Sequence, residues 1–285
     1  MTDIRMLAVD LDGTLLGKGP IESRDVAALL EAQDRGIEVV VATGRSWVES
    51  QHALKALGLG GVMIGAGGAM LHDATSGQTL HRTPVDIEVI ECVCQQLLAE
   101  GHVVNLLQDS HRVGFDYWMV GTNDVDPATA WWFKEHNINA RWVSTLAEID
   151  DFTNTVRVGT VAVGSQLTDV TAAIRHALAD RVHVQHWQAV VETEASGEPT
   201  HLLEAFAPGV DKWTMLTHLA AERGIDPSQI AAIGDGLNDI VMLREARIGI
   251  AMAGAEPAVE AASDWVTGAM GGGVADAIGR LLDLR

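Results

Sequence analysis

The sequence has very little cysteine, and its two cysteines are badly placed to pair. Cys92 and Cys94 are the only two among 285 residues, and they stand two apart in a segment with a helical pattern. Their side chains therefore point in different directions, which suits neither a disulfide nor a metal clamp. This excludes a disulfide-stapled scaffold and favours a reducing, cytoplasmic environment.

Basic residues and long apolar runs are also scarce. The chain has 19 Lys and Arg against 39 Asp and Glu, a formal net charge of −20 at pH 7. Such a charge repels nucleic acid and anionic membranes unless a basic patch offsets it, and the sequence contains none. It has no uncharged apolar stretch of about 18 residues and no basic leader followed by an apolar run. We therefore expect a soluble, unexported protein that binds neither nucleic acid nor membranes.

The first 83 residues alternate between apolar runs and helical patterns. The runs 4–9, 37–42 and 62–64 are typical of buried parallel strands. Between the first two runs we predict a helix that Ser23 caps and Gly36 ends, and a second helix over 46–57 stops at Gly58. This βαβ rhythm predicts an α/β fold with an open, doubly wound, mostly parallel sheet.

The middle of the chain differs from both ends. We predict α+β elements there, with strands over 102–107, 112–120, 155–163 and 200–206. A helix starts at Asp126-Pro127, and another lies near 167–179. A further helix has the inward positions Ile87, Ile90, Cys94, Leu97 and Leu98. The βαβ rhythm returns after Gly209 with helices over 211–223, 238–245 and 273–283 and strands over 230–233 and 248–252. We therefore expect a core domain made of residues 1–83 and 207–285, split by an inserted α+β domain over 84–206.

Polar residues follow three of the predicted core strands at the point where each strand ends. These residues are Asp10 and Asp12, then Thr43, Gly44 and Arg45, and finally Asp235, Asn238 and Asp239. In an open parallel sheet the ligand site lies beyond the carboxyl ends of the strands, so these groups should meet at one edge.

The chemistry of this set points to phosphoryl transfer. Carboxylates held together need a compensating cation, and an all-oxygen set without His or Cys fits a hard divalent ion, Mg²⁺ when phosphate is the substrate. Lys212 and Arg45 add positive charge, and Thr43 offers a hydroxyl. An ionised Asp can attack phosphorus to form an aspartyl-phosphate, while a second carboxylate two residues on acts as acid and base, typically worth about 10² to 10⁴ in rate.

Four sequence motifs carry a resemblance to a known family. DLDGT at 10–14, TGR at 43–45, GVDK at 209–212 and GDGLND at 234–239 resemble the motifs of the haloacid dehalogenase (HAD) superfamily. Their order, with a large insert between the second and third, is similar to that of the Cof-like phosphatases with a type IIB cap. The resemblance covers the whole chain, and it implies a HAD-like Rossmannoid core with an inserted α+β cap.

The resemblance also implies a role for each motif residue. Asp10 would be the nucleophile and Asp12 the general acid and base. Asp235 would complete a Mg²⁺ site with Asp10 and the main-chain carbonyl of Asp12, and Asp239 would support it. The phosphoryl group would be held by Thr43 and Lys212 in a pocket that Gly44 and Asn238 line. Two roles stay open for Arg45, a phosphate contact and a salt bridge.

One segment departs from the family pattern. Such proteins commonly carry an Asn-Gly-Ala turn after the third strand, whereas this chain has Gly65-Ala66-Gly67-Gly68-Ala69. The departure would remove a polar contact near the substrate entrance.

Together these observations predict a Mg²⁺-dependent phosphatase for a small phosphorylated metabolite. Sugar phosphates are the substrate class that the resemblance favours. A sugar-phosphate mutase of the same superfamily and a non-catalytic regulator that binds a phosphorylated ligand are the alternatives. The sequence leaves open whether the protein is a monomer or a homodimer.

Overall fold

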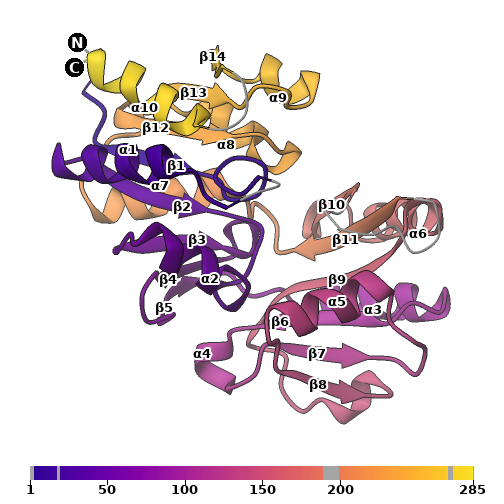
Figure 1. The fold of residues 1–285 in the computed structure, drawn as a ribbon. Helices are drawn as coiled ribbons and strands as arrows, with labels where there is room; N and C mark the ends of the chain where they lie inside the picture. The colour runs from indigo at the N-terminus through magenta and orange to yellow at the C-terminus, as the bar shows by residue number, and fades with distance from the viewer. Residues whose placement is uncertain (1–2, 18–19, 189–198, 269–271, 285) are drawn as a thin grey trace. The chain divides into compact units, whose positions relative to one another are not determined.

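The computed structural model describes residues 3–17, 20–188, 199–268 and 272–284 (Figure 1). The chain divides into two compact units. One comprises Met1–His81 with Asp211–Arg285, and we call it the core unit. The other, Arg82–Val210, is called the inserted unit.

The core unit is built on an eight-stranded sheet with the strand order β14-β13-β12-β1-β2-β3-β4-β5. The strands are β1 Met6–Val9, β2 Glu38–Ala42, β3 Val62–Gly65, β4 Met70–Asp73, β5 Thr79–Arg82, β12 Ile230–Gly234, β13 Ile248–Ala251 and β14 Trp265–Val266. The run from β14 to β3 is parallel, and β4 turns back antiparallel to β3. The predicted α/β fold with a mostly parallel sheet is confirmed.

Helices cover both faces of this sheet. They are α1 Ser23–Asp34, α2 Trp47–Leu57, α7 Lys212–Glu222, α8 Ile240–Glu245, α9 Pro257–Ala261 and α10 Gly273–Asp283. Leu7 and Val9 of β1 join an apolar cluster with α1, α2 and α10, while Met6 and Ala8 join a second cluster with α7, α8 and α9. Because successive side chains of a strand point to opposite faces, a strand buried on both faces is continuously apolar.

Local sequence signals set some of the helix ends in the core unit. In α2 the Ser46 side chain accepts a hydrogen bond from the Glu49 backbone, Glu49 reciprocates, and Gly58 closes the helix with a φ of 64°. Gly36 likewise adopts the predicted left-handed conformation. The predicted cap at Ser23 is wrong: α1 begins at Ser23 after an extended Glu22, so Ser23 already lies inside the helix and does not cap it.

The inserted unit contains a six-stranded sheet with the order β10-β11-β9-β6-β7-β8. Its strands are β6 Val104–Gln108, β7 Tyr117–Val120, β8 Ala140–Val143, β9 Thr155–Val163, β10 His183–Gln188 and β11 Thr200–Phe206, and its helices are α3 Ile87–Ala99, α4 Ser110–Val113, α5 Pro127–Glu135 and α6 Gly164–Leu178. Neighbouring strands are antiparallel except β7 and β8. Helices α3 and α6 share one apolar cluster with one face of the sheet. This is the predicted α+β architecture.

Two details of the inserted unit correct the sequence prediction. The predicted strand 112–120 begins only at Tyr117, because residues 110–113 form α4, which Gly114 ends with a φ of 78°. Ile87 is 52% exposed, since it is the first residue of α3, and the buried face starts at Val89. The sequence does not predict the strands β4, β5, β8 and β14 or the helix α9.

Among the described residues, no helix is long and apolar enough to cross a membrane. Cys92 and Cys94 both lie in α3 and are free thiols, as their spacing predicts. Burial raises the pKa of the Cys94 thiol.

Candidate active site

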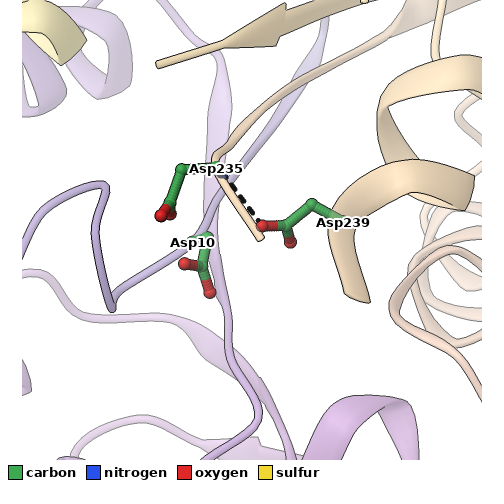
Figure 2. Close-up of side chains that lie close together, drawn as sticks. All are labelled: Asp10, Asp235 and Asp239. Atoms are coloured by element: carbon green, nitrogen blue, oxygen red, sulfur yellow. Dashed lines mark hydrogen bonds between the residues drawn. The ribbon is translucent and has the colours of Figure 1, made fainter. Parts of the chain in front are cut away.

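Three carboxylates meet at the carboxyl ends of β1 and β12. Asp10 follows β1, Asp235 follows β12, and Asp239 closes the short 3₁₀ turn Leu237–Asp239. One oxygen of each lies within 4.8 Å of the other two, and Figure 2 shows the three side chains converging. The parallel pairing of β1 with β12 explains this meeting, because it sets both strand ends at one edge of the sheet.

Lys212, the first residue of α7, joins two of these carboxylates. Its Nζ donates to Asp10 Oδ1 at 2.6 Å and to Asp239 Oδ1 at 2.7 Å, and its side chain is 0% exposed. Burial alone would lower the pKa of Lys212, but the charges of Asp10 and Asp239 outweigh it and raise the pKa. The buried lysine is therefore a fixed positive charge.

Asp239 is held on both oxygens. One accepts from Lys212. The other, Oδ2, accepts from the backbone N–H of Asp235 at 3.1 Å, which Figure 2 marks with a dashed line, and from that of Gly236 at 2.9 Å. Gly234 leaves the room for this carboxylate, because a Cβ there would lie 2.5 Å from Asp239 Cγ. Asp239 thus fixes both the ammonium group and the loop that carries Asp235.

The cluster has an excess of negative charge. Burial raises the pKa of Asp10 well above its usual range, although Lys212 opposes the shift. Burial likewise raises the pKa of Asp235 to about 6, against a 2.8 Å hydrogen bond from Thr14 Oγ1. Three carboxylates face one ammonium group, so when all are ionised the cluster lacks two positive charges. An all-oxygen donor set with that deficit fits a hard divalent cation.

Asp12 and Arg45 form a neighbouring ion pair. Arg45 Nε donates to Asp12 Oδ2 at 2.8 Å, and a terminal nitrogen of Arg45 contacts Asp12 Oδ1. The guanidinium group therefore binds the carboxylate in a bidentate way. Side-chain exposure is 16% for Arg45 and 34% for Asp12. Of the two roles that the sequence leaves open for Arg45, the salt bridge is the one present in this structure.

The remaining predicted residues lie at the ends of β2 and β12. Thr43 is 0% exposed, and its Oγ1 accepts from the Arg45 N–H at 3.2 Å. A Cβ on Gly44 would lie 3.6 Å from Asn238 Nδ2, so these two residues are neighbours. The Gly67 N–H donates to the Thr43 carbonyl at 3.0 Å. The glycine-rich turn after β3 therefore buttresses the second motif through its backbone.

The sequence analysis missed two residues of the site. Thr14 binds Asp235, and Gly13 makes that approach possible, since it has a φ of 80° and a Cβ there would lie 1.9 Å from Asp235 Oδ2. Both belong to the DLDGT motif, so the motif itself was the available signal.

Comparison with known proteins agrees with this site. The family model for haloacid dehalogenase-like hydrolases matches residues 7–278. The chain is 25% identical over 266 residues to the 5-amino-6-(5-phospho-D-ribitylamino)uracil phosphatase of Bacillus subtilis strain 168, covering 93% of this chain and 90% of that protein. It is 29% identical over 273 residues to the pyridoxal phosphate phosphatase of Escherichia coli K12, covering 93% of each.

Solved structures show the same fold. A structure described as a HAD subclass IIB sugar phosphatase superposes with a TM-score of 0.78 at 20% sequence identity, covering 97% of this chain and 98% of that one. Together with the match to the family model, this confirms the resemblance read from the four motifs. The chain belongs to the haloacid dehalogenase-like hydrolases, and within them to the Cof-like phosphatases.

Proposed function

We propose that the protein is a Mg²⁺-dependent phosphatase that hydrolyses a small phosphorylated metabolite through an aspartyl-phosphate on Asp10. The observation that carries the proposal is the buried charge cluster. In it, Lys212 Nζ lies 2.6 Å from Asp10 Oδ1 and 2.7 Å from Asp239 Oδ1, and Asp235 adds a third carboxylate, so negative charge exceeds positive charge. A buried lysine there supplies a fixed positive charge for a phosphoryl oxygen.

We assign the metal site to the Asp10 and Asp235 carboxylates and the main-chain carbonyl of Asp12. When bound, Mg²⁺ would offset the charge on the phosphoryl oxygens and keep the carboxylates ionised. Both oxygens of Asp239 already accept hydrogen bonds from protein groups, which supports a positioning role for it beside the metal. The double contact of Asp239 with the Asp235 loop keeps the second ligand in place.

In the first half-reaction a carboxylate oxygen of Asp10 forms a bond to phosphorus, and the bond from phosphorus to the alkoxide oxygen breaks. The leaving alkoxide takes a proton from Asp12. In the second half-reaction Asp12 takes a proton from water, whose oxygen attacks phosphorus and displaces Asp10. Because Arg45 binds both oxygens of Asp12, at least one of these two contacts has to break before Asp12 can carry the proton.

The phosphoryl group would be held by residues at the ends of β2 and β12. The Thr43 hydroxyl, the backbone of Gly44, the Asn238 amide and the Lys212 ammonium group are the donors available there. Fixed donors at a dry site stabilise the charge that develops in transfer, so Thr43 and Lys212, both 0% exposed, are the strongest candidates.

The relatives guide the substrate class. The named substrates of two of them are a phosphorylated ribitylaminouracil and pyridoxal phosphate, and one structural neighbour is a sugar phosphatase. We propose a sugar phosphate or a comparably small phosphomonoester, with the inserted unit as the cap that selects the leaving group. We further propose a cytoplasmic monomer or homodimer, consistent with the free thiols in α3.

The test is phosphate release from sugar phosphates, nucleotides and p-nitrophenyl phosphate, each with Mg²⁺ or with EDTA. Asp10→Asn is compared with the unaltered protein and with Asp34→Asn, a control at an exposed carboxylate on α1. We expect Mg²⁺-dependent release that Asp10→Asn lowers at least about 10⁴-fold and Asp34→Asn leaves unchanged.

Three results would contradict the proposal. Full activity in Asp10→Asn would remove the nucleophile. A reaction that needs a bisphosphate activator and returns the phosphoryl group to sugar would instead identify a mutase. Failure to release phosphate from any substrate, by a folded protein that binds Mg²⁺, would favour the non-catalytic regulator.

A further inference from the structure

A cavity lies entirely within the inserted unit. Its volume is about 230 Å³, and all the residues that line it fall between Gly101 and Gln166. None of these residues was predicted to have a functional role, and none of them belongs to the site at the ends of β1 and β12. The cavity therefore needs an explanation of its own.

The cavity is lined partly by the face of the inserted sheet opposite to the apolar cluster of α3 and α6, and partly by Ala162 and by Gln166 in the first turn of α6. Asn105, Met119 and Val161 line it, and each alternates along its strand with neighbours that belong to the apolar cluster under α3 and α6. Helix α5 contributes the Thr129 wall, and its Phe133 ring stacks on Tyr117 of the same sheet face at 5.2 Å.

Within the inserted unit, the cavity is far from the connection that enters from β5. The Val85 N–H of that connection donates to the carbonyl of Thr155 at the start of β9, whereas Val161 lies six residues further along the strand. At about 3.3 Å per residue, about 20 Å of strand separates them. The cavity is thus at the opposite end of the inserted sheet from this connection.

Hydrogen bonds to the backbone fix the walls of the cavity. Asn123 Nδ2 donates to the Gly101 carbonyl at 2.6 Å, and Thr160 Oγ1 donates to the Val103 carbonyl at 2.8 Å. Asp126 caps α5 by accepting from the Ala128 N–H at 2.9 Å. A cavity whose rim is held in this way is preorganised for a ligand.

Within the described residues, two polar side chains of the lining have no hydrogen-bond partner in the protein. Thr129 as a residue is only 6% exposed, but its hydroxyl oxygen is not among the buried atoms that lack a partner, so this oxygen is accessible from the cavity. The same holds for the half-buried amide of Asn105, beside which Gly159 leaves space. Polar groups that are free to reach a cavity in this way are expected to hydrogen-bond to water or to a ligand that enters it.

The charges around the cavity select the kind of ligand. Among the described residues, His102 lines it but no lysine or arginine does, and Asp124 and Asp126 add negative charge, which disfavours a phosphate group. The Asn105 amide and the Thr129 hydroxyl can each donate and accept, which matches hydroxyl groups of a ligand. Met119 and Val161 offer apolar surface for its C–H groups.

We propose that this cavity is a second binding site, which takes a small, neutral polyhydroxylated molecule without phosphate. The inference goes beyond the proposed phosphatase function, because the described lining of this cavity contains none of the residues proposed for catalysis and carries no lysine or arginine that could offset a phosphate charge. It rests on the Thr129 hydroxyl, the Asn105 amide and the absence of lysine and arginine from the described lining.

The binding test uses saturation-transfer NMR on the full chain in EDTA, with D-glucitol, D-glucose, putrescine and inorganic phosphate as separate probes. We expect glucitol or glucose to bind and phosphate not to displace it. Asp10→Asn should bind the same probe equally well, which separates this site from the proposed active site. Binding of putrescine alone, binding of phosphate that displaces the sugar, or no binding of either neutral probe would overturn the proposal.

Variants of the cavity wall make the test specific. Thr129→Val keeps the shape of the side chain and removes the hydroxyl, so the affinity for the neutral probe should fall about threefold to tenfold. Thr129→Ser should retain it. Thr168→Val, on the exposed side of α6, is the matched control and should change nothing. Equal affinity in Thr129→Val and the unaltered protein would overturn the assignment, and phosphate release should be the same in all of these variants.

Discussion

Each unit buries one basic side chain among carboxylates, but with different charge balance. In the core unit Lys212 serves Asp10 and Asp239, and Asp235 adds a third carboxylate beside them. In the inserted unit Arg157 pairs with Glu204 at 2.8 Å and donates to the Tyr117 hydroxyl at 2.8 Å, so each buried charge has an opposite partner. A surplus of one sign marks a place where a ligand completes the charge, whereas a matched pair belongs to the scaffold.

The largest effect should come from Lys212→Met. Without the ammonium group, Asp10 and Asp239 are left buried without their cation, so the metal-free protein should lose about 3–5 kcal/mol of unfolding free energy. Loss of the phosphoryl contact should lower kcat/KM by about 10³. Urea unfolding in EDTA and steady-state kinetics with Mg²⁺ measure the two effects.

The matched control for this prediction is Lys55→Met, at an exposed lysine in the last turn of α2. It should change neither quantity. A Lys212→Met protein that loses activity but keeps its metal-free stability would show that the ammonium group does not neutralise the buried carboxylates.

The matched pair of the inserted unit should behave differently. Arg157→Met leaves Glu204 buried without its cation and should destabilise this unit by about 3–5 kcal/mol, whereas the double variant Arg157→Met/Glu204→Gln should recover most of that loss. The kcat for a saturating substrate should change less than about twofold in the double variant, since neither residue belongs to the proposed active site. Five of the eight tryptophans lie in this unit, so urea unfolding followed by fluorescence reports on it.

If the double variant were as unstable as Arg157→Met, or lost phosphatase activity, the pair would not be a replaceable part of the scaffold. The contrast with Lys212 would then fail.

The two units also differ in how much of each the sequence predicts, and strand pairing is the reason. Parallel pairing puts the ends of β1, β2 and β12 at one edge, so a polar residue just after each strand is placed without knowledge of side-chain packing. Asp10, Thr43 and Asp235 were found for that reason. The sequence could not decide whether Arg45 forms a salt bridge with Asp12 or contacts phosphate, because both roles need an arginine at the same strand end.

The inserted unit was predictable in its elements but not in its contacts. The ranges of β9 and β11 agree with the predicted strands 155–163 and 200–206. Antiparallel register, however, depends on turns and on irregularities such as the shift between Leu107 and Gln108, and a slip of one residue exchanges the two faces. Nothing in the order of residues therefore showed that Asn105 and Thr129 line one cavity.

Two glycines with similar backbone angles sharpen the comparison further. Gly13 has a φ of 80° and faces Asp235, whereas Gly114 has a φ of 78° and nothing within 4 Å of its missing Cβ. Gly13→Ala should displace the Asp235 carboxylate and lower kcat/KM about 10²-fold. Gly114→Ala should cost only about 1 kcal/mol, through the backbone strain alone. Kinetics and urea unfolding of both variants measure the difference.

Equal activity losses in Gly13→Ala and Gly114→Ala would contradict the close approach to Asp235. The effect of Gly13→Ala would then come from backbone strain alone.

The smallest expected effect is the pH dependence of metal-free stability that Asp235 causes. Burial raises its pKa to about 6 in the folded protein, against about 3.9 in an unfolded chain. Between these values the folded state binds more protons, so the contribution of Asp235 to stability falls as pH rises from about 4 to about 6 and then levels off.

Asp235→Asn removes this contribution. In EDTA, the Tm of Asp235→Asn minus the Tm of the unaltered protein should therefore increase by about 2–4 °C between pH 4.5 and pH 6.5. Saturating Mg²⁺ should reverse the sign in the unaltered protein, because the bound cation favours the ionised carboxylate that the Asn variant lacks. Parallel Tm curves in EDTA would mean that Asp235 titrates normally, and the surplus of negative charge that distinguishes the core unit would then be smaller than its geometry indicates.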